Sequence, residues 1–417
     1  MTAEEPQPLS PDAPGAPDAL SASSPHTPGT SVPDTPGASA VGAPGASAVG
    51  ARSGSVLDAL TDVAGIRVGH AEVAGAGALS GTTVVLAPEG GAVAAVDVRG
   101  GGPGTRETDA LDPRNLVQRV DAVVLTGGSA YGLDAASGVM GWLEERGRGV
   151  RVGPEPTQVV PVVPAAALFN LGRGGDWRAR PDASTGRAAV EAAAASGPGA
   201  AVAEGSVGAG TGAVAGQLKG GIGTASVRLP SGVTVAALVA VNAAGSVLDP
   251  RTGVLFGEYG AGEPPAYPAA ATHAAAVRRL ERAREAREAA AGGAPPFNTT
   301  IAVVATDAAL VRAQAQKLAG TAHDGMARAV RPVHLLTDGD TVFALATGRV
   351  AVESENPAAV NEILAAGADV LARAIVKAVR AARSVQGPGG TFLAYTDLYG
   401  PGGRGGDVDA PGRSGGA

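Results

Sequence analysis

The residues with the clearest chemical potential stand at Asn298-Thr-Thr300, where a segment ending in Pro and Gly gives way to a run of β-branched residues. A Thr hydroxyl at the start of a rigid strand can attack the carbonyl before it and turn that amide into an ester, which water then hydrolyses. The α-amine freed in this way has a reference pKa near ~8 and can serve as a base for its own hydroxyl. The tripeptide alone is more typical of a turn before a strand, so other residues must support this hypothesis.

A pair of carboxylates gives the first support. Asp338 and Asp340 flank a glycine in the turn predicted between two strands at 333–336 and 341–346. Carboxylates at such a turn can orient a nucleophile or hold an amine. An Asp-Gly sequence is also an ordinary hairpin turn, so this pattern is compatible with a purely structural role.

Two further polar residues and a glycine-rich stretch are candidates for the same site. Asn242 follows a strong strand and can donate its amide to an oxyanion, or simply end the strand. Lys219 is one of only three lysines, and a lysine can lose its proton near neutral pH, whereas an arginine cannot. The stretch 205–212 lacks both the P-loop spacing and the dinucleotide fingerprint, which disfavours a Rossmann-type cofactor enzyme and favours close backbone packing.

Composition and charge exclude several classes of function. The net charge of −7 gives no electrostatic support for nucleic-acid binding. The absence of cysteine excludes disulfides and thiolate sites, and the five histidines do not fall at metal-ligand spacing, so we expect neither a metal nor a cofactor. No apolar run is long enough for a bilayer and no secretory signal is present, so we predict a cytoplasmic protein without membrane attachment.

The chain divides by composition into four parts. Residues 1–53 are rich in Pro, Ala and Ser and are expected to be disordered, as is the Gly-rich tail 399–417. Residues 54–398 are predicted to form a single domain. Within that domain, 257–297 reads as a linker before the cleavage site, and cleavage would give one chain ending at 298 and another beginning at 299.

The hydrophobic pattern predicts short strands that alternate with Ala-rich helices, which favours a layered α+β fold over a parallel doubly wound sheet. Strands are predicted at 66–70, 83–87, 93–98, 122–126, 224–229, 233–241, 299–304, 333–336 and 341–346. Helices are predicted at 131–145, 187–195, 273–291, 308–329 and 357–383. The helix at 273–291 has few large apolar residues and is expected to be solvated.

Five motifs, in this order, carry a family resemblance. They are Leu60-Thr-Asp-Val-Ala-Gly-Ile-Arg-Val-Gly-His70, Gly104-Thr-Arg-Glu-Thr-Asp109, Leu125-Thr-Gly-Gly-Ser-Ala-Tyr-Gly132, Val207-Gly-Ala-Gly-Thr-Gly-Ala213 and Asn298-Thr-Thr300. The chain resembles the self-cleaving aminopeptidase/esterase family, which includes DmpA-type L-aminopeptidase/D-Ala-esterases, β-peptidyl aminopeptidases and nylon-oligomer hydrolases. The Thr after Asn is most similar to the 6-aminohexanoate-oligomer endohydrolase branch.

The resemblance implies a fold and a set of roles. The fold would be an αββα four-layer sandwich of the DmpA/ornithine acetyltransferase type, with two chains after autocleavage and a tetramer of cleaved units. Thr299 resembles the nucleophile. The supporting residues carried over by motif order are Lys219, Asn242, Asp338, Asp340 and Tyr131, the last of which looks like a Tyr that helps to bind the oxyanion.

The function predicted is therefore an autoprocessed hydrolase of small peptides, amino-acid amides or amino-acid oligomers. Two alternatives stay open: an acyl transferase like the ornithine acetyltransferases, and a catalytically silent binding protein with the same fold. The base, either Lys219 or the α-amine of Thr299, is also left open. The long N-terminal segment and the length of 257–297 depart from the family pattern.

Overall fold

The computed structural model describes residues 56–260, 262–291, 297–353 and 356–400. All described elements belong to the unit Gly54–Ala417. The segments predicted to be disordered, 1–53 and 399–417, lie outside the described residues apart from 399–400.

The larger sheet has six strands in the order β12-β13-β14-β15-β3-β5. They span Ile222–Arg228 (β12), Thr234–Ala240 (β13), Ile301–Ala308 (β14), Thr341–Val350 (β15), Ala92–Val98 (β3) and Arg119–Val120 (β5). Strands β12 and β13 form the predicted hairpin, and Gly232 supplies the positive φ of +85° that its turn needs. β14 lies antiparallel to β13 and parallel to β15, so the sheet is mixed.

The smaller sheet has five strands in the order β1-β2-β6-β9-β4. They span Arg67–Glu72 (β1), Gly81–Leu86 (β2), Ala122–Thr126 (β6), Ala165–Ala167 (β9) and Gly104–Arg106 (β4). The predicted strands, with the exception of 333–336, are thus present within a few residues of their expected bounds.

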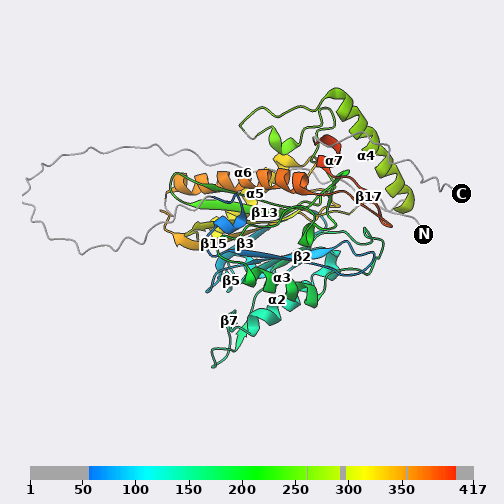
Figure 1. Ribbon diagram of the computed structural model, residues 1–417. Coiled ribbons are helices and arrows are strands. Elements are labelled where there is room, and N and C mark those ends of the chain that lie inside the picture. The colour runs from blue at the N-terminus through cyan, green and yellow to red at the C-terminus, as the bar shows by residue number, and fades with distance from the viewer. Residues whose placement is uncertain (1–55, 261, 292–296, 354–355, 401–417) are drawn as a thin grey trace, which may run out of the picture. The chain divides into compact units, whose positions relative to one another are not determined.

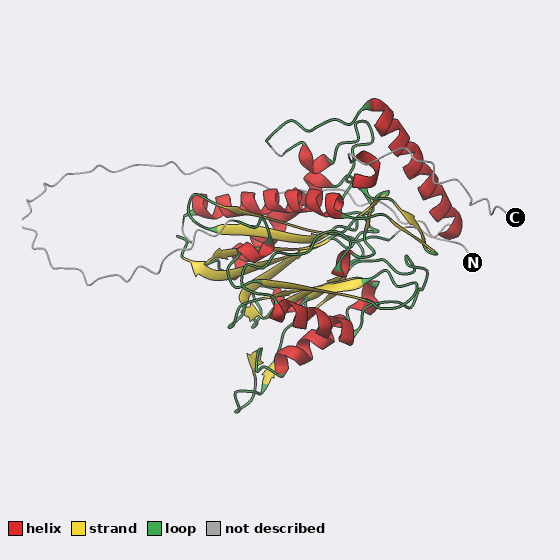
Figure 2. Ribbon diagram, in the orientation of Figure 1, coloured by secondary structure: helices red, strands yellow, loops and turns green. Residues whose placement is uncertain are grey.

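Helices cover the outer face of each sheet, which gives four layers (Figures 1 and 2). α5 (Arg312–Ala329) and α6 (Pro357–Ala381) pack on the six-stranded sheet, and α2 (Ala135–Glu144) and α3 (Ala183–Ala195) pack on the five-stranded sheet. The predicted α+β class and the αββα sandwich are therefore confirmed.

Alternation along the strands explains why the layers stack in this way. In β14, Ile301 and Val303 point into the core between the two sheets, whereas Ala302 and Val304 face the core under α5 and α6. Successive side chains of a strand point to opposite faces, so a strand that is apolar throughout must be covered on both sides. The buried Thr299 stands two residues before the start of this strand.

Several short elements complete the described structure. They are α1 (Ser129–Gly132), α7 (Tyr395–Tyr399), β7 (Val150–Arg151), β8 (Val159–Val160), β10 (Val214–Ala215), β11 (Leu218–Lys219), β16 (Val385–Gly387), β17 (Gly390–Phe392) and the 3₁₀ turns Leu60–Asp62, Asp109–Leu111, Gly208–Gly210 and Phe256–Glu258. The helix predicted at 131–145 is in fact two helices, α1 and α2. Among the described helices, none is long and apolar enough to cross a membrane.

The strand predicted at 333–336 is wrong, because this segment is a loop that leads into β15. Its backbone N–H groups bind carboxylates instead of a neighbouring strand: His334 N donates to Asp340 Oδ2 and Leu335 N donates to Asp338 Oδ2. The acidic pair therefore does not stand in a hairpin turn. It ties a loop together at the edge of the sheet.

The segment 257–297 is less solvated than the sequence predicts. Its helix α4 spans Ala270–Ala291 and packs against β17 and α7. Ala276, Leu280 and Ala283 on one face are buried, because small apolar residues at these spacings form a narrow stripe on a helix otherwise rich in charge. Tyr399, predicted to lie in the disordered tail, ends α7 and its hydroxyl lies 3.0 Å from His273 Nδ1 on α4.

Candidate functional site

Hydrogen bonds fix the backbone on both sides of the Asn298–Thr299 bond. Thr299 N donates to the carbonyl oxygen of Asn242 at 2.6 Å, and Asn298 N donates to the carbonyl oxygen of Thr337 at 3.1 Å. Thr300 N donates to Asp340 Oδ1 at 2.8 Å. Asn298 and Thr299 are only 7% and 4% exposed. The bond is therefore held in one place rather than carried on a free loop.

The hydroxyl of Thr299 lies against the carbonyl before it. Its Oγ1 donates a hydrogen bond to the carbonyl oxygen of Asn298. On the other side stands Gly339, where an added Cβ would come within 2.8 Å of Thr299 Oγ1. Only glycine leaves the space that the hydroxyl occupies, so the position between the two predicted acidic residues is itself part of the site.

The acidic pair holds the loop around Thr299. Asp338 Oδ1 accepts from Ala244 N at 3.0 Å. Asp340 Oδ2 accepts from His334 N and lies 2.9 Å from His334 Nδ1. Burial, and then the nearby charge of Asp340, raises the pKa of Asp338. In the continuous chain the nitrogen of Thr299 is bound by Asn242, so the role of the pair in holding an ammonium stays a prediction for the cut chain.

Arg173 joins the side chain of Asn242 to that of Asn298, and sequence reasoning missed it. Its Nη1 donates to Asn242 Oδ1 and, at 2.8 Å, to the carbonyl oxygen of Gly212. Its Nη2 donates to Asn298 Oδ1 at 2.7 Å. The only local signal is that Arg173 stands among glycines in a turn after β9, and the chain has many arginines.

Asn242 is held through both ends of its side-chain amide. Besides Arg173, its Oδ1 accepts from Val214 N at 3.0 Å, and its Nδ2 donates to the carbonyl oxygen of Phe169 at 3.2 Å. The assigned orientation of the amide follows this hydrogen-bond network. The predicted oxyanion donor is thus present at the site and is occupied by Phe169 in the continuous chain.

Lys219 is fully buried and has an unusual environment. Its Nζ donates to the carbonyl oxygens of Gly210 at 3.0 Å and Gly220 at 2.9 Å. Burial, together with the positive charge of Arg173, lowers its pKa to about 7. The glycine-rich stretch 205–212 therefore offers carbonyl oxygens to the basic groups of Lys219 and Arg173. Its N–H groups at Gly208 and Ala209 already donate to Glu72 and Thr83.

Sheet register explains why these residues meet. Ala240 of β13 pairs with Ile301 of β14, and Ile301 pairs with Thr341 of β15. Residues just beyond β13 and just before β14 and β15 therefore share one edge of the sheet, which places Asn242, Thr299 and Asp340 together. An added Cβ at Gly220 would come within 1.9 Å of the carbonyl oxygen of Val241, so the residue after Lys219 packs closely against the residue before Asn242.

Tyr131 is the predicted site residue that the described contacts do not join to this cluster. It lies on α1, is 57% exposed, and has the Arg180 guanidinium 3.8 Å from its ring centroid. The hydrogen bonds among the described residues do not link it to Thr299. Its oxyanion role stays a prediction.

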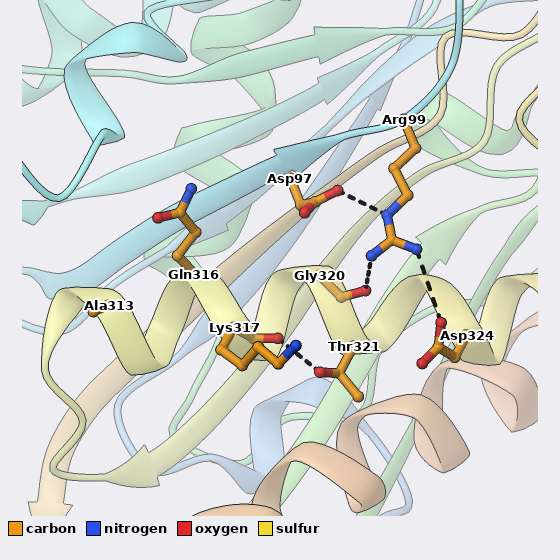
Figure 3. A pocket seen from close by; sticks show the side chains of 8 residues that line it. All are labelled: Asp97, Arg99, Ala313, Gln316, Lys317, Gly320, Thr321 and Asp324. Carbon is orange, nitrogen blue, oxygen red and sulfur yellow. Dashed lines mark hydrogen bonds and ion pairs between the residues drawn. The ribbon is translucent and has the colours of Figure 1, made fainter. Parts of the chain in front are cut away.

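A surface cavity of about 360 Å³ lies elsewhere, between the end of β3 and α5 (Figure 3). Arg99 there donates to Asp97 and the carbonyl oxygen of Gly320 and lies 3.8 Å from Asp324. Its charge is therefore already compensated, and the predicted site residues do not line this cavity. Among the described residues, no group of three or more His, Asp or Glu could hold a metal ion.

Comparison with known proteins places the chain in a family. The model of peptidase family S58 matches residues 58–393. A protein of Mycobacterium tuberculosis (strain ATCC 25618 / H37Rv) named as an uncharacterized aminopeptidase is 50% identical over 363 residues, 82% of this chain and 98% of that protein. A 6-aminohexanoate-oligomer endohydrolase of Kocuria sp. (strain KY2) is 31% identical over 299 residues, 69% of this chain and 75% of that protein.

A solved structure supports the same assignment at the level of the fold. The L-aminopeptidase D-Ala-esterase/amidase from Ochrobactrum anthropi, described as a variant of the Ntn hydrolase fold, superposes with a TM-score of 0.60 at 22% identity. The match covers 81% of this chain and 91% of that chain. The resemblance predicted from the five motifs is confirmed, and the relatives named above are hydrolases, which favours neither acyl transfer nor silent binding. The chain belongs to peptidase family S58 and is a hydrolase of amide bonds.

Proposed function

We propose that the chain cuts itself between Asn298 and Thr299, and that the freed Thr299 then hydrolyses amide substrates through an ester intermediate. The observation that carries this proposal is the buried Thr299 hydroxyl, which donates to the carbonyl oxygen of Asn298. Attack forms the Oγ–C bond, breaks the C–N bond and delivers the hydroxyl proton to the departing nitrogen. Water then cleaves the ester and leaves Thr299 with a free α-amine.

Lys219 is the base that we propose for the first cut. In the continuous chain the nitrogen of Thr299 is an amide, which is too weakly basic to take the hydroxyl proton before the C–N bond begins to break. The lowered pKa of Lys219, about 7, keeps a large fraction of its amine neutral at neutral pH. After the cut, the α-amine of Thr299 becomes a second candidate base for substrate turnover.

Stabilisation of the oxyanion is assigned in the proposal to Asn242 and Tyr131. Asn242 Nδ2 must first release the carbonyl of Phe169, to which it donates in the continuous chain. Loss of one such donor typically costs ~3 kcal/mol in the transition state. Asp338 and Asp340 are proposed to hold the new ammonium of Thr299, since Asp340 already binds the N–H of the next residue.

Denaturing electrophoresis of the purified protein tests self-cleavage. We expect two fragments, 1–298 and 299–417, with Thr299 as the new N-terminus by sequencing. Thr299→Ala should give one full-length band and no amide hydrolysis, whereas Thr299→Ser should still be cut, because it keeps the hydroxyl. A wild-type chain that stays full-length on storage would contradict the proposal.

The substrate class is proposed from the relatives and covers small peptides, amino-acid amides and amino-acid oligomers. One relative is named as an aminopeptidase and another as an endohydrolase of 6-aminohexanoate oligomers. Aminoacyl p-nitroanilides and short amide oligomers would rank these substrates. Adding an acceptor amine during turnover distinguishes hydrolysis from acyl transfer, and we expect free acid to remain the main product.

We further propose that the cleaved units assemble as a tetramer, as the family resemblance implies, and that this assembly is cytoplasmic. Light scattering coupled to size-exclusion chromatography measures the mass of the assembly directly. A mass of a single cleaved unit at micromolar concentration would contradict the tetramer.

A further inference from the structure

The side chain of Asn298 occupies a built binding site in the continuous chain. Arg173 Nη2 donates to Asn298 Oδ1 at 2.7 Å, while Nη1 of the same guanidinium is held by Asn242 Oδ1 and the carbonyl oxygen of Gly212. Nη1 is therefore fixed by Asn242 and Gly212, whereas Nη2 binds the side chain of Asn298, the residue whose carbonyl is attacked in the proposed cleavage. Asn298 is 7% exposed, so this grip is shielded from water.

The charge in this site has no acidic partner among the described residues. The hydrogen bonds of Arg173 go to three neutral oxygens, and its neighbours Lys219 and Arg287 are basic groups, not acidic ones. A buried guanidinium that loses an oxygen acceptor leaves an N–H unsatisfied, which is more costly than the loss of an ordinary surface contact. The site therefore demands an oxygen at the position of Asn298 Oδ1.

The residue before Asn298 shows where the buried site ends. The ring of Phe297 lies 5.7 Å from that of Phe169, and Phe169 in turn contacts Trp177. Phe297 and Trp177 are 46% and 54% exposed, so this aromatic edge is open to solvent. The buried site therefore encloses the side chain of Asn298 and not that of Phe297 before it.

Self-cleavage and substrate turnover pass through the same kind of ester. In the first, Thr299 Oγ carries the carbonyl of Asn298; in the second, it carries the carbonyl of the substrate's acyl residue. The oxygen is the same atom on the same strand, so in both esters the side chain of the acyl residue starts from the same point. Once the end of the first chain has left, that side chain meets the neighbours that Asn298 had.

We infer that Arg173, positioned by Asn242, is the specificity-determining residue of the acyl subsite and selects acyl residues with an oxygen on Cγ, namely asparaginyl and aspartyl amides. This inference rests on the proposed function. Leucyl amides have the same branched shape at Cγ but no oxygen there, so they leave Nη2 of Arg173 without an acceptor. An aspartyl side chain supplies in addition the negative charge that the site lacks.

The test compares asparaginyl, aspartyl and leucyl p-nitroanilides with the self-cleaved protein. We expect kcat/KM for the asparaginyl and aspartyl compounds to exceed that for the leucyl compound by about tenfold or more, the range for a hydrogen bond to a charged group. In Arg173→Met this preference should fall to within about threefold. In the matched control Arg287→Met it should persist, because that guanidinium donates to the carbonyl of Thr391 and does not contact Asn298.

A second series keeps the inference testable if Arg173→Met does not cut itself. In the otherwise wild-type chain, Asn298→Leu should slow self-cleavage by about tenfold or more, and Asn298→Asp should not. Equal cleavage of Asn298→Leu and wild type would overturn the inference, as would equal or faster hydrolysis of the leucyl anilide by wild type. A wild-type protein that neither cuts itself nor hydrolyses any amide would overturn the proposed function and this inference with it.

Discussion

Gly339 faces the Thr299 hydroxyl, and adding one methyl group there tests the geometry of attack. A Cβ at this position would lie 2.8 Å from both Thr299 Oγ1 and the carbonyl oxygen of Gly102, so one of them must move. Because a small misplacement of a reacting atom is costly, we expect Gly339→Ala to slow self-cleavage by about tenfold or more. The measurement is the loss of the full-length band over time.

Gly102→Ala is the matched control for that prediction. Its added Cβ would approach nothing closer than the carbonyl oxygen of Leu336 at 3.4 Å, which is ordinary contact. We expect cleavage of this variant at nearly the wild-type rate. Equal slowing of both variants would show that the loop, and not the space at Thr299, limits the reaction.

We predict that the titration of Lys219 sets the pH dependence of self-cleavage. A lysine acts as a base only when neutral, and burial lowers the pKa of Lys219 from its ordinary 10.5 to about 7. The rate should therefore rise with pH through about 7 and level off above it. Lys219→Met should slow cleavage by about 100-fold or more and remove this rise, as expected for loss of a general base.

The exposed Lys317 provides the comparison, since Lys317→Met should leave both the rate and its pH profile unchanged. Cleavage is followed after rapid dilution of denatured chain into buffers of different pH. The range from about pH 6 to about pH 8 spans roughly one unit on each side of the Lys219 pKa. A wild-type cleavage rate that does not change over this range would show that Lys219 is not the base.

At the scale of elements, α4 is a packed helix within a segment that the sequence predicts to be a linker. Leu280 on its buried face is 4% exposed. Leu280→Ala should lower the free energy of unfolding by about 2–4 kcal/mol, through lost burial and the cavity left behind. Urea unfolding measures this change. Glu281→Ala, on the exposed side of the same turn, should change stability by less than about 0.5 kcal/mol; similar losses in both variants would mean that α4 does not pack as described.

At the scale of the whole molecule, the two chains that the proposed cut would make share one sheet. β14 and β15 come from the second chain, and they pair with β13 and β3 of the first. The fragments 1–298 and 299–417 should therefore elute together in native size-exclusion chromatography and separate only in denaturant. Uncut Thr299→Ala should elute at the same position. Elution of the smaller fragment alone would contradict this arrangement.

Acid should destabilise the whole fold through buried histidine. His323 stands on the buried face of α5 with its ring centroid 4.8 Å from that of His334, and burial lowers its pKa from 6.5 to about 4. Between these values the unfolded chain binds the extra proton, so stability is full above pH 6.5 and falls as the pH drops toward 4. The expected loss from this group is on the order of 2 kcal/mol between pH 7 and pH 4.5.

His323→Gln isolates that contribution, because a glutamine amide can still donate to the carbonyl oxygen of Asp97 as His323 Nε2 does at 3.0 Å. Urea unfolding at the two pH values should show a smaller acid loss in the variant than in wild type. The same loss in both would assign the acid sensitivity to other groups.

The sequence by itself determined the family and the layered fold, and it predicted Thr299 as the nucleophile. Each of these depends on local signals: β-branched runs with a period of two, Ala-rich helical stretches, and five short motifs in order. It also predicted Asn242, Asp338 and Asp340 from their places beside predicted strands, and Lys219 as one of only three lysines and from the order of the motifs.

Only the tertiary structure decided the role of Arg173, the loop at 333–336 and the buried face of α4. Which arginine of many loses its water depends on how segments far apart in the chain pack around it, and no local pattern records that. The segment 333–336 does not pair with a strand, because the carboxylates of Asp338 and Asp340 accept hydrogen bonds from its backbone N–H groups. Tertiary contacts override local propensity wherever they supply the hydrogen bonds that a strand would otherwise need.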